Sequence, residues 1–181
     1  MESYIETVSG IKFEFLDPKP DQFRIGDIAH ALSMNCRYVG HSRVFYSVAE
    51  HSWQMARMLS GLPKEIQLGA LLHDASEAYI TDVASPVKQH LPDYQKMEDV
   101  IMTALFSKYN LEYPLHPAIK VADRAILSIE AHYLIPSQGR EWGMWTEATR
   151  PPIDSTYKPV GMLPKQAKTL FLDKFYELTR E

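Results

Sequence analysis

Four residues of types that commonly bind divalent metal ions lie in or beside the apolar faces of segments with helical spacing. They are two histidines and two aspartates: His51, His73, Asp74 and Asp123. His73 and Asp74 are adjacent. On a helix, two such side chains point about 100° apart, yet both can reach one point beyond the surface. Taken singly, each residue has a simpler interpretation as a boundary or surface residue.

Taken together, two imidazoles and two carboxylates form a ligand set suited to Mn, Fe, Co, Ni or Zn. Four protein ligands leave room for water or substrate only on an ion with octahedral coordination. We therefore expect one divalent ion of that kind rather than a closed tetrahedral zinc site. Two acids, Glu77 and Asp82, follow the His-Asp pair closely enough to reach the same pocket without being ligands.

Three segments must position these residues, and the period of their apolar residues predicts a helix for each, over about 46–60, 63–80 and 117–134. Gly61 favours the end of the first helix, and Pro63 favours the start of the second. The same pattern predicts helices near 25–34, 93–109 and 165–179, and alternation around Gly10 predicts a hairpin over about 3–16. Residues 136–164, rich in Pro and Gly, are expected to be irregular. The fold is thus predicted to be an all-α helical bundle with a short N-terminal β-hairpin, in one domain over 1–181 with a helical core over about 25–134.

Composition excludes several classes of function. The chain has 181 residues and a formal net charge of -4, which implies no general affinity for nucleic acid or for an anionic membrane. Cys36 is the only cysteine in the sequence, so an internal disulfide and a cysteine zinc cluster are excluded. Neither a signal peptide nor an apolar run long enough to span a membrane is evident. We expect a cytoplasmic protein.

Three stretches have the residue pattern of a known superfamily. They are Val48-Ala49-Glu50-His51-Ser52, Leu72-His73-Asp74-Ala75-Ser76-Glu77-Ala78 and Val121-Ala122-Asp123-Arg124-Ala125. In this order the chain resembles the HD superfamily of metal-dependent phosphohydrolases. The stretch 81–88 makes it more similar to the bacterial and phage branch that includes the 5'-deoxynucleotidases. The resemblance covers roughly residues 25–131, and the hairpin and the run 36–41 are more similar to phage-type members.

The resemblance implies a role for each candidate residue. The four ligands named above would bind one ion, which would polarise a phosphoryl oxygen and orient or activate a water. Glu77 is the first choice for handling the proton, and Asp82 is the second. Arg37 would grip the phosphate, with Tyr38 and His41 lining the pocket. Lys88 is a weaker candidate for the same pocket.

Three functions remain open at this point. The first is removal of the 5'-phosphate from ribonucleoside or deoxyribonucleoside monophosphates. The second is release of triphosphate from a deoxynucleoside triphosphate, which would need more cations around the phosphate, such as Arg37, Arg43, Lys88 and Lys120. The third is a non-catalytic nucleotide sensor, which the presence of both Glu77 and Asp82 disfavours. Trp142 and Trp145, together with relatives of this branch, lead us to expect a homodimer.

Overall fold

The computed structural model describes residues 4–180, which are mostly helical and carry one two-stranded sheet. Strand β1 (Ile5–Glu6) pairs antiparallel with β2 (Lys12–Phe13). Gly10, at φ 80°, adopts the left-handed conformation that the connecting turn requires. Residue 3, with which the predicted hairpin begins, lies outside the described residues. The predicted all-α fold with an N-terminal hairpin is confirmed.

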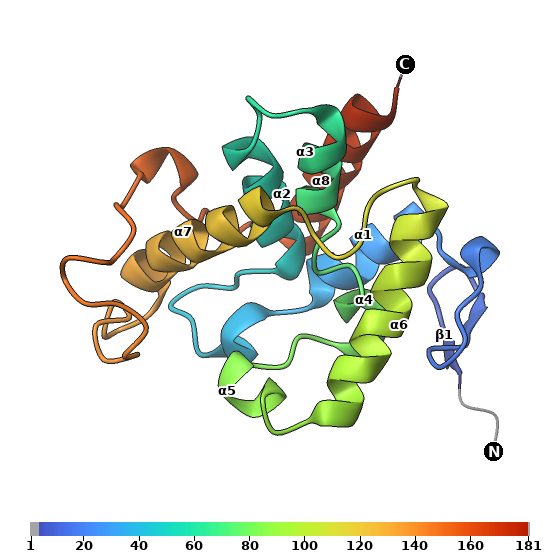
Figure 1. Cartoon of the computed structure of the whole chain (residues 1–181), viewed down its shortest axis with the longest axis horizontal. Helices are drawn as coiled ribbons and strands as arrows, with labels where there is room; N and C mark the ends of the chain where they lie inside the picture. Colours follow the sequence, from blue (N-terminus) through green and yellow to red (C-terminus); the bar gives the residue numbers. More distant parts are fainter. Residues whose placement is uncertain (1–3, 181) are drawn as a thin grey trace.

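Eight α-helices follow the hairpin within the described residues (Figure 1). They are α1 (Ile25–Met34), α2 (Val48–Met58), α3 (Lys64–Leu71), α4 (Glu77–Ile80), α5 (Ser85–Lys88), α6 (Pro92–Lys108), α7 (Pro117–Leu134) and α8 (Pro164–Thr179). Short 3-10 turns lie at Pro20–Gln22, Arg37–Gly40 and Ser155–Tyr157. Among residues 4–180, we find no helix whose length and hydropathy would let it cross a membrane.

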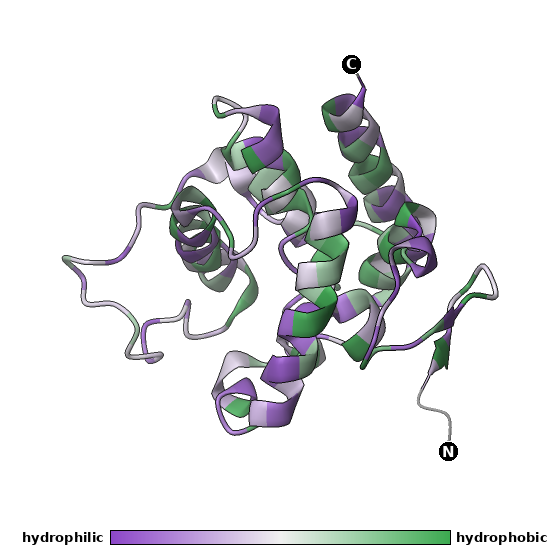
Figure 2. Cartoon of the chain, turned by 45° about the vertical axis from the view of Figure 1, so that its right-hand side comes forward, coloured by the Kyte–Doolittle hydropathy of each residue, from purple (hydrophilic) through white to green (hydrophobic). Residues whose placement is uncertain are grey.

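Helix α8 packs against α1, α2 and α3 and so closes the bundle around the main core. Its buried residues Ala167, Phe171, Phe175 and Leu178 recur at helical spacing and therefore lie on one face. Figure 2 shows apolar and polar residues on different sides of α8, the helix that ends at the label C. Because α2 and α3 are both fixed against α8, the positions of His51, on α2, and of His73, two residues after the end of α3, are fixed relative to each other.

The segment predicted as one helix over 63–80 is broken, so that prediction was wrong in its middle. Helix α3 ends at Leu71, and α4 begins only at Glu77. In an unbroken helix the carbonyl of Ala70 would accept from the N–H of Asp74. Here that carbonyl lies 2.8 Å from Nδ1 of His73, and the following backbone bonds join residues three apart. A side chain thus replaces the helical bond, and His73 and Asp74 lie in a turn.

The long connection between α7 and α8 is irregular apart from the 3-10 turn at 155–157, but it is anchored at two places. Near α7, the guanidinium of Arg150 donates to the hydroxyl and the carbonyl of Ser128. Near α8, the buried carboxylate of Glu50 accepts from the N–H groups of residues 160, 161 and 162. Glu50 belongs to α2, so this contact fixes the connection beside His51.

Candidate functional site

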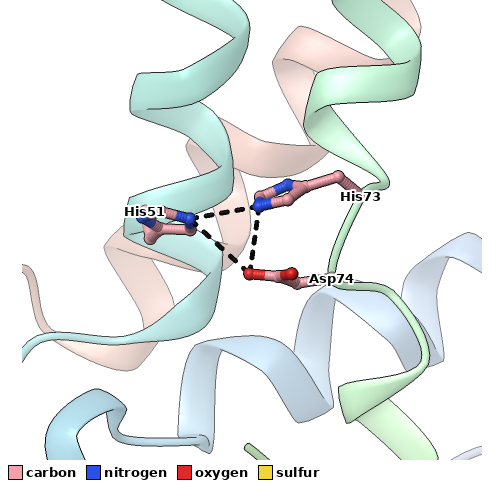
Figure 3. A group of neighbouring side chains, drawn as sticks. All are labelled: His51, His73 and Asp74. Atoms are coloured by element: carbon pink, nitrogen blue, oxygen red, sulfur yellow. Dashed lines mark hydrogen bonds and ion pairs between the residues drawn. The ribbon is translucent and has the colours of Figure 1, made fainter. Parts of the chain in front are cut away.

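Three of the predicted metal ligands converge in the space between α2 and the turn that follows α3 (Figure 3). Nε2 of His51 lies 3.2 Å from Nε2 of His73 and 3.5 Å from Oδ2 of Asp74. Nε2 of His73 lies 3.1 Å from the same carboxylate oxygen. One ligand atom from each residue therefore faces a common point.

The opposite nitrogen of each imidazole is already engaged, which fixes the ring orientation. Nδ1 of His51 lies 2.5 Å from Oε1 of Glu130, and Nδ1 of His73 bonds the Ala70 carbonyl. Because both acceptors require a proton on Nδ1, we assign the lone pair of each ring to Nε2. Two lone pairs and a carboxylate oxygen that face one another repel unless a cation lies among them. The donor set therefore fits a divalent ion.

Asp123 lies at the edge of this group. Its Oδ1 is 3.6 Å from Nε2 of His51, and its side chain is 46% exposed. It comes from α7, so the four predicted ligands belong to α2, the turn after α3, and α7. The structure thus brings His51, His73 and Asp74 into one cluster and places Asp123 beside His51 on the solvent side.

The two acids that follow the His-Asp pair lie in different surroundings. Glu77 is buried at the start of α4, and its Oε1 is 3.9 Å from Nζ of Lys88. Its Oε2 is buried without a hydrogen-bond partner among the described residues. Burial, together with the charges of Asp74 and Asp82, raises the pKa of Glu77 well above its usual value. Asp82 is half-buried, and its pKa is raised mainly by burial.

The residue before Asp82 has an unusual backbone. Thr81 has φ 66° and ψ 161°, a region that is essentially restricted to glycine. Its carbonyl accepts from the hydroxyl of Tyr94 at 2.6 Å, and its hydroxyl lies 3.4 Å from Oδ1 of Asn35. These contacts hold a strained peptide in place directly before a predicted acid.

The predicted substrate-binding residues do not form one group. Arg37 lies against the cluster, with Nη1 3.3 Å from Oδ2 of Asp74 and Nε 3.5 Å from Oε2 of Glu130. Tyr38 also lies there, and its hydroxyl donates to Oε2 of Glu130 at 2.5 Å. Lys88 is bound to Glu98 at 2.8 Å. His41 is exposed, in the loop that follows Arg37–Gly40.

Glu130 was not predicted from the sequence, although it is the most connected acid beside the cluster. It is fully buried on α7, contacts His51, Tyr38 and Arg37 as described, and accepts from the hydroxyl of Tyr46 at 2.8 Å. Burial alone would raise the pKa of Glu130, but Arg37, His51 and Tyr38 outweigh it and lower the value to about 2. One signal was available: Asp123 and Glu130 are seven residues apart, about two helical turns, and so lie on one face of α7.

Comparisons with known proteins agree with this geometry. Residues 37–120 match the family model of the HD domain. The chain is 34% identical to the uncharacterized protein YfdR of Escherichia coli (strain K12) over 177 residues, which cover 98% of this chain and 96% of that protein. It is also 35% identical to an uncharacterized protein of Rhodobacter capsulatus over 138 residues, which cover 70% of each.

Proposed function

This chain belongs to the HD-domain family, which indicates a metal-dependent hydrolase of phosphate compounds, and from that premise we propose a specific reaction. The substrate is a ribonucleoside or deoxyribonucleoside monophosphate, and the 5'-phosphate is released by attack of water. The observation that carries this proposal is the convergence of His51, His73 and Asp74 beside a buried acid, Glu77.

His51, His73, Asp74 and Asp123 would hold one divalent ion, which is Co, Mn, Ni, Fe or Zn. When bound, the ion would supply Lewis-acid stabilisation of a phosphoryl oxygen. The closeness of the first three ligand atoms supports this assignment. For Asp123 the support is its 3.6 Å distance to His51.

The chain's own residues would position the substrate and move the proton. Arg37 offers a planar fork that matches phosphate geometry, and it lies against Asp74, so it borders the space where the phosphate would lie. The pKa of Glu77 is raised well above its usual value, so its carboxyl group keeps a proton to a higher pH than an ordinary glutamate does. Glu77 is therefore the better placed of the two acids to protonate a leaving oxygen. Asp82 would order the attacking water.

The alternative of triphosphate release has less support. A triphosphate needs several free cationic groups. Of the four that the sequence offered, Lys88 is paired with Glu98, and Arg37 faces the two carboxylates of Asp74 and Glu130. This leaves the exposed Arg43 and Lys120. A monophosphate requires less positive charge, which favours the first reaction.

A substrate panel tests the proposal. The purified protein is incubated with Mn²⁺ or Co²⁺ and with nucleoside mono-, di- and triphosphates, and the released inorganic phosphate and triphosphate are measured. We expect phosphate from the monophosphates, and none from a matched His73→Ala variant. Release of triphosphate would establish the alternative reaction. Absence of turnover of every nucleotide with either ion would indicate a nucleotide sensor.

A further inference from the structure

Three aromatic side chains form a continuous row that no step of the proposed reaction uses. Tyr38 and Trp142 have ring centroids 6.2 Å apart and planes tilted by 31°. Trp142 and Trp145 have centroids 6.3 Å apart and planes tilted by 29°. We call Tyr38, Trp142 and Trp145 the aromatic row.

The aromatic row begins at the metal-ligand cluster. The Tyr38 ring lies 5.6 Å from the guanidinium carbon of Arg37, and its hydroxyl bonds Glu130, the carboxylate that also holds His51. Tyr38 and the next residue, Val39, have φ values of 59° and 53°. This left-handed conformation is uncommon for any residue with a side chain and is a clear outlier for the β-branched Val39. Strain of this kind persists where surrounding contacts require one orientation, here that of the Tyr38 ring.

The two tryptophans are not part of the hydrophobic core. Both are half-buried, and within residues 4–180 neither is among the partly buried apolar residues that pack against the buried core. They lie in the connection after α7, at the end of the molecule opposite the hairpin (Figure 1). Arg150 anchors this connection to Ser128, and its guanidinium lies 5.4 Å from the Trp145 ring. The Trp145 ring is thus held by an anchored arginine, and both indoles keep part of their surface exposed.

We propose that the aromatic row is the subsite for the base of a nucleotide, with the ring stacked on Trp142 and the phosphate at Arg37. This inference rests on the proposed function, because it assumes that the phosphate lies at the cluster. Stacking on an indole tolerates any base, since every base has a π face. The ligand class is therefore a purine or pyrimidine nucleoside phosphate, accepted with little discrimination between bases, rather than a sugar phosphate.

The test compares two substrates that differ by the base alone. Adenosine 5'-monophosphate and ribose 5-phosphate are given to the native protein, to Trp142→Leu and to Trp142→Phe. We expect kcat/KM for the nucleotide to fall about tenfold in Trp142→Leu and to stay near the native value in Trp142→Phe, which keeps an aromatic face. The value for ribose 5-phosphate should stay unchanged in both variants. Circular dichroism and melting temperature check that each variant is folded.

Equal losses for the two substrates, or no loss for either, would overturn the inference. If the native protein hydrolyses neither compound, the proposed function fails. Calorimetric measurement of the binding of the same two compounds then tests whether the aromatic row binds the base. Binding of the nucleotide that weakens about tenfold in Trp142→Leu would support the aromatic row in a non-catalytic protein. Nucleotide binding that is equal in the two proteins, or too weak to detect in the native protein, would overturn it.

Discussion

Glu130 connects the two halves of the candidate site through a single buried carboxylate. Its Oε1 accepts a hydrogen bond from Nδ1–H of His51, and its Oε2 faces Arg37 and accepts from the hydroxyl of Tyr38. A carboxylate behind a ligand histidine fixes the ring orientation and increases the basicity of the nitrogen that faces the metal. The same group therefore positions a predicted metal ligand and the predicted phosphate-binding arginine.

We expect Glu130→Gln to weaken metal binding about 10- to 100-fold. The amide keeps the size of the side chain but loses the charge, and its NH₂ group cannot accept a hydrogen bond from Nδ1–H of His51. The measurement is a calorimetric titration of the metal-free protein with Mn²⁺. Glu141→Gln, which changes an exposed glutamate, is the matched control and should bind as the native protein does. An unchanged affinity in Glu130→Gln would show that His51 does not need this partner.

Glu77→Gln should lower kcat for a nucleoside monophosphate by at least about 100-fold, because a positioned proton carrier contributes about that much. Metal content should remain that of the native protein, since Glu77 is assigned as a proton carrier and not as a ligand. Phosphate release and elemental analysis of the same sample provide the two readings. If the variant loses its metal, Glu77 has been assigned the wrong role.

The sequence predicted which segments are helical better than where the helices break. The apolar periods of α6, α7 and α8 gave bounds close to those observed, because one face of each helix packs against neighbours. The break between α3 and α4 was missed. It depends on the bond between the His73 ring and the Ala70 carbonyl, and apolar spacing carries no information about such a bond.

The buried partners of the candidate site were equally hard to predict. His51, His73 and Asp74 were recognised by residue type and by the order in which they occur. The role of Glu130 as a buried partner of the site follows only from its contacts with Tyr38, Tyr46 and Arg37. These contacts join residues more than eighty positions apart, so they follow from the packing of α7 against the Arg37–Gly40 turn and the segment before α2, and not from local pattern.

The contact of Glu50 with the connection before α8 carries a prediction about stability. Oε1 accepts from Val160 and Gly161, while Oε2 accepts from Met162 at 2.7 Å. Glu50→Gln would turn an NH₂ group toward an N–H donor, so we expect the free energy of unfolding to fall by about 2 kcal/mol. Urea unfolding measures it. Glu65→Gln, on the exposed side of α3, should change stability by less than about 0.5 kcal/mol, and an equal loss in both variants would argue against the contact.

The candidate site lies where segments that are distant in sequence meet. Residues from α2, the turn after α3, the Arg37–Gly40 turn and α7 surround one cluster. The homodimer expected from the sequence stays a prediction. It rested partly on Trp142 and Trp145, and the aromatic row gives these two side chains a different use, toward a ligand rather than toward a second copy of the chain.

The buried tyrosines predict how the whole molecule responds to alkaline pH. Burial raises the pKa of Tyr46 and of Tyr79, and it raises the pKa of Tyr109 to about 12. Unfolded tyrosine has a pKa of about 10, so above that pH the unfolded chain releases protons that the folded chain still holds. The unfolded state then binds fewer protons, and stability falls as pH rises. The stabilising effect of Tyr109 is complete below about pH 10 and is lost as the pH approaches about 12.

We therefore expect the free energy of unfolding, measured with urea between pH 8 and pH 11, to stay level up to about pH 10 and then to decline. Tyr109→Phe removes one of the responsible groups while keeping the ring that packs on Phe175, so its decline should be less steep. Tyr4→Phe, at a tyrosine that is 38% exposed, serves as the matched control and should follow the native curve. If the free energy of unfolding declines equally in the native protein and in Tyr109→Phe, the pKa of Tyr109 is the same in the folded and the unfolded chain. The alkaline loss of stability would then come from the other buried tyrosines, such as Tyr46 and Tyr79.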